Sequence, residues 1–198
     1  MIYLINLSEI ENHFDRLYNL VSDKRKEQIN EDKASISKIC HLASGLLYRF
    51  ALGNNYYELI KINEHGKPYA ENGIYFNVSH SGDYAALYIG ENECGIDIEK
   101  IEEKRITLSS KVFTDKELAW IDNNKERFFH AWTRKESISK AIGIGFSYSF
   151  KNIDVLDDCF VFDDKKRFFT STTSFDNHII SVSEENTLPD MNIKILDI

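Results

Sequence analysis

The chain repeats one plan, in which a long amphipathic helix is followed by several short apolar strands. Apolar residues recur at helical spacing over 35–52 and again over about 125–142, and a glycine follows each pattern. A helix that is apolar on one face needs a partner layer, so each half is predicted to form a lobe of its own. The strand-like runs that supply this layer lie at 74–79, 84–89 and 94–99 in the first half and at 159–162, 167–175, 178–183 and 191–197 in the second.

The expected fold class is α+β (α/β lobes), with two similar lobes related by a pseudo-two-fold axis. In each lobe a long helix packs on a small antiparallel sheet, and the three strands of the first half are expected to form a meander. The lobes are expected at 1–100 and 101–198. A slight likeness between residues 76–83 and 169–176 supports an internal duplication. Such a pair of lobes places its main cleft at their junction.

The composition limits the partners and the compartment. A formal net charge of −8 argues against binding to nucleic acid or to an anionic membrane surface. No apolar run approaches the roughly 20 residues of a membrane span, and residues 1–7 resemble a first strand more than a signal peptide. Cys40, Cys94 and Cys159 are odd in number and form no CxxC pair. This pattern predicts a cytoplasmic protein with neither a disulfide framework nor a zinc site.

Two acidic residues alternate on the last predicted strand of the first half. Asp97 and Glu99 are two positions apart, so in a strand their carboxylates point to the same face. For such a pair alone a solvated strand end is the more common explanation, but the neighbouring isoleucines make the other face apolar. Glu136 and Lys140 belong to the second long helix and are expected near the same junction. Three hard oxygen ligands beside a lysine suit Mg²⁺ and a phosphorylated substrate.

The second long helix offers a plain alternative, because Glu136 and Lys140 have the spacing of a surface ion pair. Glu136 nevertheless lies beside Trp132, on the flank of the apolar stripe that must pack inward. Lys135 lies inside that stripe, where an ammonium group without a partner is costly. Lys135 must therefore either extend to solvent or meet an anion.

Polar donors gather where the first predicted strand of the meander ends. Asn77, Ser79 and Ser81 face one side of the strand and His80 faces the other. A histidine that caps a turn is the commoner case, yet a cluster of donors suits phosphate oxygens, which accept several hydrogen bonds at once. Lys67 follows Gly66 in an earlier loop, and as a single residue it is more often a plain surface charge.

Four segments in this order resemble the motifs of the 4′-phosphopantetheinyl transferases. The first three are Gly66-Lys67-Pro68, Phe76-Asn77-Val78-Ser79-His80-Ser81 and Gly95-Ile96-Asp97-Ile98-Glu99. The fourth is Trp132-Thr133-Arg134-Lys135-Glu136-Ser137-Ile138-Ser139-Lys140. Each motif alone is weak, but four in order with similar gaps are specific. The chain length resembles the Sfp-type branch, in which two lobes form a pseudo-dimer in one chain, and this implies a monomer.

The resemblance implies a reaction and a catalytic site. The family transfers the 4′-phosphopantetheine arm of coenzyme A to a serine of an apo acyl or peptidyl carrier protein, releasing adenosine 3′,5′-bisphosphate. By similarity, Asp97, Glu99 and Glu136 would hold Mg²⁺ against the pyrophosphate, and Mn²⁺ would also accept these ligands. Glu136 would act as the base for the carrier serine, directly or through a water. Lys140 would contact the phosphates and stabilise or protonate the leaving group.

The resemblance also implies contacts to coenzyme A. Lys67, Ser79 and His80 match positions that contact its phosphates, and Arg25 belongs to a basic cluster, Lys24-Arg25-Lys26, of the kind that holds the 3′-phosphate and adenine. Two positions depart from the family pattern. His41 stands where an arginine is expected, and Gln28 replaces a basic residue. The 3′-phosphate is therefore expected either to bind more weakly or to be bound by Lys33 or Lys38 instead.

The expected protein partner is a carrier protein, and carriers are typically acidic. Because this chain is acidic too, docking is expected to use a hydrophobic patch near the cleft that includes Phe113 or Trp120. Two rival functions remain at this point. One is another metal-dependent phosphotransferase or pyrophosphohydrolase. The other is a non-catalytic homologue that binds coenzyme A or a carrier. No residue indicates which carrier or pathway is served.

Overall fold

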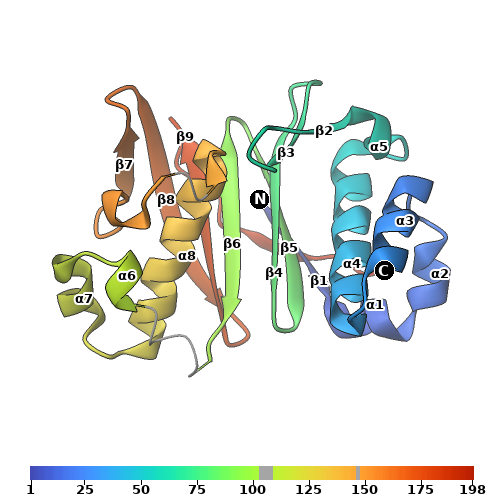
Figure 1. Cartoon of the computed structure of the whole chain (residues 1–198), viewed down its shortest axis with the longest axis horizontal. Helices are drawn as coiled ribbons and strands as arrows, with labels where there is room; N and C mark the ends of the chain where they lie inside the picture. Colours follow the sequence, from blue (N-terminus) through green and yellow to red (C-terminus); the bar gives the residue numbers. More distant parts are fainter. Residues whose placement is uncertain (103–108, 146–147) are drawn as a thin grey trace.

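Two sheets stand side by side, each with a layer of helices against it (Figure 1). This computed structural model describes residues 1–102, 109–145 and 148–198. The first sheet lies between the helices α1–α4 and the second sheet, and α8 packs on the second sheet (Figure 1). The mixture of helices and mainly antiparallel strands confirms the predicted α+β class.

The first sheet has the strand order β10-β1-β5-β4. β1 pairs antiparallel with β5 and parallel with β10. Leu42, Leu46 and Leu47 of α4 are buried against this sheet, because apolar residues at helical spacing give the helix one apolar face. The elements of this half are β1 (Ile2–Asn6), α1 (Leu7–Asn12), α2 (Phe14–Tyr18), α3 (Asp23–Glu31), α4 (Ser35–Leu52), α5 (Tyr56–Leu59), β2 (Ile60–Ile62), β3 (Pro68–Ala70), β4 (Tyr75–Ser81), β5 (Tyr84–Gly90) and, from the far end of the chain, β10 (Ile193–Ile195).

The second sheet has the strand order β6-β9-β8-β7, and all its pairs are antiparallel. Phe128, Ala131 and Ile138 of α8 are buried in a core that also receives Phe168 of the sheet. The elements of this half are β6 (Cys94–Lys100), α6 (Ser109–Val112), α7 (Asp115–Ile121), α8 (Lys125–Ile142), the short 3-10 helix η3 (Phe150–Asn152), β7 (Cys159–Phe162), β8 (Lys166–Phe175) and β9 (His178–Glu185).

The two halves share a core topology, as the predicted pseudo-two-fold requires, and differ in the fourth strand, since β10 pairs with β1 whereas β7 pairs with β8. In each half a strand, β1 or β6, leads through short helices to an 18-residue helix, α4 or α8, and then to a hairpin, β4–β5 or β8–β9. Both hairpins close with a two-residue turn, since Ser81 pairs with Tyr84 and Phe175 pairs with His178. This register makes Ser81 equivalent to Phe175. The sequence likeness placed Ser81 opposite Ser174, so it is one residue out of register.

The predicted meander in the first half is wrong, because β6 pairs with β9 and not with β5. β5 already has β1 on one edge and β4 on the other, which leaves no place for a third partner. β6 instead joins the second sheet, and β10 crosses back to the first. The lobe boundary expected after residue 100 therefore follows a strand that belongs by hydrogen bonding to the second half. Ile96 and Ile98 of β6 fill a third core, which lies between the sheets.

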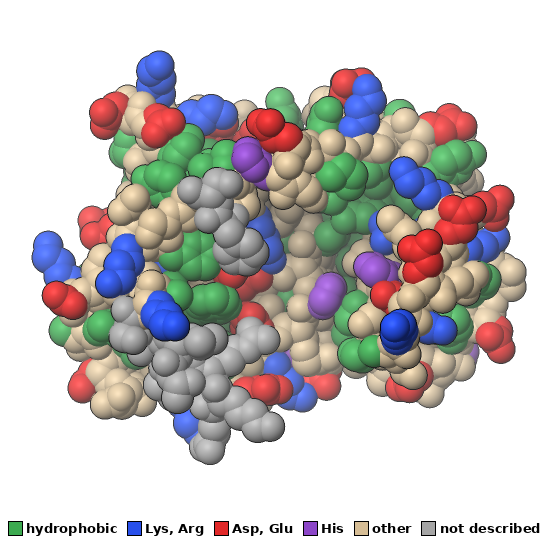
Figure 2. Space-filling model, viewed as in Figure 1, with side chains coloured by type: hydrophobic (Ala, Val, Ile, Leu, Met, Phe, Trp, Pro, Cys, Tyr) green, Lys and Arg blue, Asp and Glu red, His purple; other side chains and the backbone are tan. Residues whose placement is uncertain are grey.

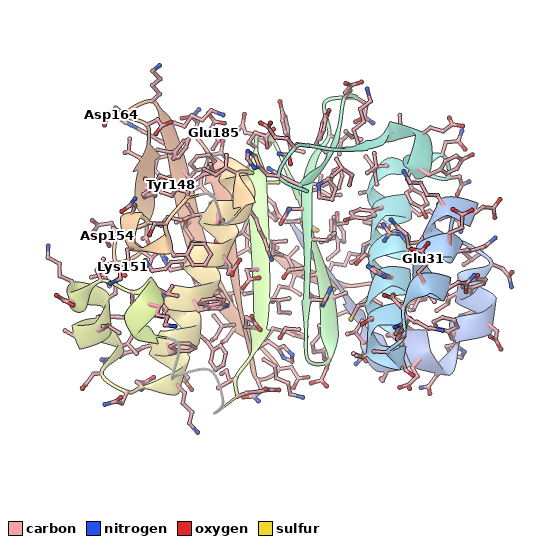
Figure 3. The ribbon with its side chains drawn as sticks, in the orientation of Figure 1. Glu31, Tyr148, Lys151, Asp154, Asp164 and Glu185 are labelled. Atoms are coloured by element: carbon pink, nitrogen blue, oxygen red, sulfur yellow. The ribbon has the colours of Figure 1, made fainter. Side chains whose placement is uncertain are left out.

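A buried ion pair fastens α8 to the segments on its outer side. Lys135 and Glu117 of α7 are both fully buried, and Lys135 Nζ lies 2.8 Å from Glu117 Oε1. Lys135 Nζ also donates to the carbonyl oxygens of Phe150 and Ile153. These belong to the segment in which Figure 3 labels Lys151 and Asp154 beside the helix. The sequence predicted that Lys135 either extends to solvent or pairs with an anion. The structure shows the second outcome, with Glu117 as the anion.

Among the helices that the structure describes, none combines the length and the apolar character needed to cross a bilayer.

Candidate active site

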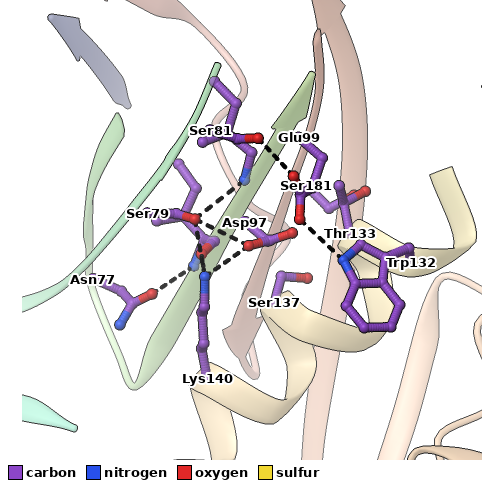
Figure 4. A network of polar contacts seen from close by, with 12 residues as sticks. Asn77, Ser79, Ser81, Asp97, Glu99, Trp132, Thr133, Ser137, Lys140 and Ser181 are labelled. Atoms are coloured by element: carbon purple, nitrogen blue, oxygen red, sulfur yellow. Dashed lines mark hydrogen bonds and ion pairs between the residues drawn. The ribbon is translucent and has the colours of Figure 1, made fainter. Parts of the chain in front are cut away.

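The helix α8 lies directly on the strand β6, because small residues line the contact. A Cβ atom on Gly95 would lie 2.1 Å from the carbonyl oxygen of Ser137 and 2.4 Å from the amide nitrogen of Ala141. On the neighbouring strand β9, Ser181 Oγ lies 2.7 Å from Thr133 Oγ1, and Ser183 Oγ lies 2.7 Å from Ser137 Oγ. This close approach brings the side chains of α8 to the carboxylates of β6 (Figure 4).

Asp97 is the best-defined group of the site (Figure 4). It is buried, and its Oδ1 accepts hydrogen bonds from Lys140 Nζ at 2.7 Å and from Ser79 Oγ at 3.0 Å. Burial raises the pKa of Asp97, although the nearby Lys140 acts in the opposite direction. Its second oxygen, Oδ2, is buried with no hydrogen-bond partner among the described residues. Such an atom normally requires a ligand, because an unpaired buried acceptor is costly.

Glu99 lies beside Asp97 on the same strand face, as the alternation predicts. Its Oε2 accepts from Ser81 Oγ at 2.6 Å, and its Oε1 accepts from Trp132 Nε1 at 3.2 Å (Figure 4). Only 9% of Glu99 is exposed, so it is not a solvated strand end. The indole of Trp132 therefore links α8 to the second acidic position of β6.

Polar side chains of β4 accept hydrogen bonds from the open edge of β6. The backbone amide of Ile96 donates to Asn77 Oδ1 at 3.0 Å, and that of Ile98 donates to Ser79 Oγ at 3.4 Å. The amide of Lys100 likewise donates to Ser81 Oγ at 3.2 Å. Side chains of one strand thus replace the backbone partner that β6 lacks on this edge. The prediction that the side chains of Asn77, Ser79 and Ser81 face one side of the strand is confirmed. These side chains link the two sheets at the site.

Lys140 joins all parts of the site. Its Nζ donates to Asp97 Oδ1, to Ser79 Oγ at 3.0 Å and to the carbonyl oxygen of Ile96 at 3.1 Å. Glu136 lies one turn earlier on α8 and is partly buried. Both side chains border a pocket of about 290 Å³, which we call the Lys140 pocket. It is lined by His65, Gly66, Lys67, Pro68, Asn77, Val78, Glu136, Ser139, Lys140, Gly143 and Gly145.

The residues present fit a hard cation such as Mg²⁺. Asp97 offers a buried oxygen that no described residue contacts by a hydrogen bond, and Glu99 adds a second carboxylate on the same strand face. Carboxylate oxygens are the ligands that Mg²⁺ prefers. Within the described residues, however, no group of three histidine, cysteine, aspartate or glutamate side chains already has the geometry of a metal site. The set Asp97, Glu99 and Glu136 therefore stays a prediction.

Lys67 reaches the site from a separate hairpin that docks on the end of α8. Asn63 Oδ1 accepts from the amide of Lys67 at 2.9 Å, and Asn63 Nδ2 donates to the carbonyl oxygen of Gly143 at 2.8 Å. Lys67 Nζ then donates to Glu93 Oε2 at 2.7 Å and to the carbonyl oxygen of Ala141 at 3.0 Å. The Gly66-Lys67-Pro68 segment thus forms one wall of the Lys140 pocket.

Two of the predicted contacts lie outside this pocket. His80 lines a different hollow, on the other side of β4. The guanidinium of Arg25 lies 5.4 Å from the ring centre of Tyr48, in a small hollow with Tyr56 and Tyr57. Of the predicted site residues, the structure therefore brings together Lys67, Ser79, Asp97, Glu99, Glu136 and Lys140, and it places Arg25 and His80 elsewhere.

The two aromatic residues expected at a docking patch differ in exposure. Phe113 is buried in the second core against Phe128, so it is not available on the surface. Trp120 is 36% exposed and borders a hollow of about 630 Å³ with Arg127 and His130. Phe113 follows a helix of four residues, which is too short to show periodicity, so its inward direction could not be predicted from the sequence.

The lowered pKa of His130, which lines this hollow, leads us to expect a lower free energy of unfolding in acid. Burial and the charge of Arg134 lower the pKa of His130 from 6.5 to about 4. The folded protein therefore binds a proton at this ring less readily than the unfolded chain does. The neutral ring contributes fully to the free energy of unfolding above pH 6.5, and this contribution is lost as the pH falls from about 6.5 towards 4. We expect His130→Gln to flatten the decline of the unfolding free energy over this range. Urea unfolding at several pH values measures it, with the exposed His13→Gln as control. An unchanged slope in His130→Gln would contradict the assignment.

Several parts of the site carried no signal in the sequence. Gly95 and the buried hydroxyls of α8 and β9 act through contacts between residues that are far apart in the sequence. Trp132 was part of a recognised segment and Glu93 was not. Their partners, Glu99 and Lys67, lie 33 and 26 positions away in the chain. Pairs so far apart can be found only once the packing of α8 on β6 is known.

Comparison with known proteins agrees with this geometry. Residues 93–188 match the model of the 4′-phosphopantetheinyl transferase superfamily. Over this range the chain is similar to the superfamily. The matched range holds all four groups that converge between β6 and α8, namely Asp97, Glu99, Glu136 and Lys140. Lys67 and Ser79 lie before it.

Curated relatives in the superfamily match at moderate identity. The 4′-phosphopantetheinyl transferase gsp of Aneurinibacillus migulanus is 39% identical over 92 residues, which are 44% of this chain and 39% of that protein. The 4′-phosphopantetheinyl transferase Sfp of Bacillus subtilis is 26% identical over 162 residues, 75% of this chain and 71% of that protein. The chain thus spans less than half the length of the gsp relative. A solved holo-(acyl-carrier-protein) synthase of Thermotoga maritima shares 17% identity with a TM-score of 0.38, covering 47% of this chain and 62% of that one.

Proposed function

We propose that the chain transfers the 4′-phosphopantetheine arm of coenzyme A to a serine hydroxyl of an apo acyl or peptidyl carrier protein. The observation that carries the proposal is the group formed by Ser79, Asp97 and Lys140 at the wall of the Lys140 pocket. This group combines a cation for phosphate oxygens with a buried carboxylate oxygen that has no partner in the described parts of the chain. The match of residues 93–188 to the superfamily model supports the same reaction.

The bonds that change are those of the pyrophosphate. The serine oxygen forms a bond to the phosphorus that carries the pantetheine arm, and the bond from that phosphorus to the bridging oxygen breaks. Adenosine 3′,5′-bisphosphate leaves with the bridging oxygen and its electron pair. Glu136 lines the pocket beside Lys140 and accepts the serine proton, directly or through a water. Lys140 contacts the phosphate oxygens and stabilises the charge that develops on the leaving group.

The metal of the proposed reaction is Mg²⁺, with Mn²⁺ as an alternative that the same ligands accept. Asp97, Glu99 and Glu136 would hold it. When bound, it supplies positive charge to the pyrophosphate oxygens. Ser79 and Trp132 keep the first two carboxylates in place through the hydrogen bonds described above, so their own role is to orient these ligands.

Coenzyme A contacts from Lys67 and Ser79 are supported by their position at or beside the Lys140 pocket. A contact from Arg25 lacks this support, since its guanidinium lies against Tyr48. We propose that the protein acts as a monomer in the cytoplasm, without binding nucleic acid or a membrane. The three free cysteine thiols agree with a reducing compartment.

The variant Glu136→Ala tests the reaction. With coenzyme A and an apo carrier, the native protein is expected to add the phosphopantetheine mass to the carrier. Glu136→Ala is expected to lose transfer by about a hundredfold or more, because a general base and a metal ligand are removed together. Glu126→Ala, an exposed acid at the start of the same helix, serves as the matched control and should retain transfer.

The same assay separates the rival functions. Hydrolysis of coenzyme A without mass gain on the carrier would indicate a pyrophosphohydrolase. Binding of coenzyme A without turnover, equal in the native protein and in Glu136→Ala, would indicate a non-catalytic homologue. Full transfer by Glu136→Ala would overturn the proposed mechanism.

A further inference from the structure

The loop between β2 and β3 connects the first half of the molecule to the second. It spans residues 63–67 and lies between α5 and the C-terminal end of α8 (Figure 1). It crosses the upper end of the hollow that Figure 2 shows where the two halves meet. We call residues 63–67 the Asn63 loop. Three of its residues line the Lys140 pocket, so its placement decides the shape of that pocket.

The side chain of Asn63 gives this loop its shape. Its Oδ1 accepts hydrogen bonds from the backbone amides of His65 at 3.0 Å and Lys67 at 2.9 Å. The backbone of Asn63 closes the same turn, since its amide donates to the carbonyl oxygen of Lys67 and its carbonyl oxygen accepts from the amide of Gly66, both at 3.0 Å. An asparagine that accepts from amides further along its own chain orders a turn much as backbone bonds do.

The amide nitrogen of the same side chain attaches the loop to α8. Asn63 Nδ2 donates to the carbonyl oxygen of Gly143 at 2.8 Å, and Lys67 Nζ donates to that of Ala141 at 3.0 Å. The last carbonyl groups of a helix have no partners within the helix, and side chains from elsewhere can serve as their donors. These two donors therefore cap the C-terminal end of α8.

The loop fits closely on the glycine that ends α8. Gly143 has a φ of 76°, in the left-handed region, and a Cβ atom on it would lie 2.9 Å from Cδ of Lys67 and 3.5 Å from Nδ2 of Asn63. Gly53 ends the counterpart helix α4 with a φ of 83°, but a Cβ atom there would meet no described atom within 4 Å. The two helix ends thus share a backbone conformation and differ in the loop that covers α8.

We propose that Asn63 is a positioning residue for the binding of coenzyme A. Its side chain holds one wall of the Lys140 pocket in place before the substrate enters, which avoids the entropy cost of ordering the loop on binding. The inference rests on the proposed function, which assigns this pocket to coenzyme A. Lys140 is held independently of the loop, by Asp97 and Ser79. Loss of the contact from Asn63 to α8 therefore weakens binding and leaves the chemical step nearly unchanged.

The variant Asn63→Asp separates the two tasks of this side chain. It keeps oxygens that accept from the amides of the loop, but it loses the donor and places a negative charge against the carbonyl oxygen of Gly143. In the transfer assay we expect the KM for coenzyme A to rise by about tenfold or more, with kcat and the KM for the carrier within about twofold of native. Asn72→Asp is the matched control and should behave as native, because the exposed Asn72 also accepts from an amide two positions on, that of Ile74.

A second pair of variants tests the contact from the side of the helix. Gly143→Ala and Gly53→Ala introduce the same left-handed strain, but only Gly143→Ala presses a Cβ atom against the Asn63 loop. Thermal unfolding should therefore show similar losses of stability in the two variants. Calorimetric titration with coenzyme A, without a carrier, should show weaker binding in Gly143→Ala and native binding in Gly53→Ala. A purely structural role of the loop would make the two variants alike.

The outcomes separate this inference from the proposed function. If the native protein transfers the arm of coenzyme A and Asn63→Asp keeps the native KM for coenzyme A, the inference fails and the proposed function stands. A fall in kcat with an unchanged KM, or equal losses in the matched controls, would also overturn it. If the native protein shows no transfer, the proposed function fails, and calorimetry still tests the role of Asn63. Should Asn63→Asp not fold, the pair of glycine variants decides.

Discussion

Replacing Gly95 with alanine is expected to slow transfer by about a hundredfold while leaving the chain folded. The added Cβ would meet the backbone of α8 at Ser137 and Ala141, at distances no carbon atom tolerates. Backbone atoms cannot rotate away as a flexible side chain can, so the whole helix must shift from β6. Lys140 and Glu136 then move away from Asp97, and a displacement of about 1 Å in such a site costs about a hundredfold in rate.

The stability of Gly95→Ala should fall by about 1–3 kcal/mol, the usual result of overpacking. Gly95 does not have a positive φ, so the effect comes from contact alone. Gly45→Ala is the matched control. Gly45 lies in α4, the counterpart of α8 in the other half, and its added Cβ would meet only side-chain atoms of Arg25 and Val21, at 3.0 Å and beyond. Transfer rates and urea unfolding measure both variants. Native transfer by Gly95→Ala would show that α8 does not set the geometry of the site.

The second large effect is expected from Lys135→Met, which should lower the free energy of unfolding by about 3–5 kcal/mol. Both members of the ion pair are fully buried, so removal of Lys135 leaves the charge of Glu117 without its partner. The carbonyl oxygens of Phe150 and Ile153 lose a donor as well. A typical domain is stable by only about 5–15 kcal/mol, so this variant approaches the limit of folding.

A double variant separates the buried charge from the loss of packing. Glu117→Gln removes the charge and keeps an acceptor oxygen for one of the two backbone amides that donate to Glu117, those of Val155 and Thr114. Glu117→Gln combined with Lys135→Met should therefore cost less than the sum of the two single changes. Urea unfolding with a constant m-value provides the measurement. If Lys135→Met cost less than about 1 kcal/mol, the pair would not stabilise α8.

The sequence predicted those features that depend on local pattern. The helices at 35–52 and 125–142 agree with α4 and α8 in the structure, because each carries one continuous apolar face and ends at a glycine. The common face of Asp97 and Glu99 follows from strand geometry alone and is confirmed by the partners Ser79 and Ser81.

What the sequence could not predict are choices between distant partners. An alternating strand such as β6 is equally compatible with β5, its neighbour in the chain, and with β9, which lies about 80 residues later. Only the occupation of both edges of β5 decides between them. The same holds for the hydrogen bond from Asn63 to Gly143 and for the fit of α8 on Gly95, since neither leaves a periodic trace in the sequence.

The exchange of strands between the two halves has a consequence for the order of events during synthesis. The first sheet receives β10, which follows β9 in the chain, and the strand that carries Asp97 and Glu99 finds its partner β9 only after some 80 further residues have been added. The second sheet therefore waits for β9 and the first waits for β10. We expect a chain that stops before β9 to leave β6 without its strand partner, so that the two carboxylates lack the sheet that supports them.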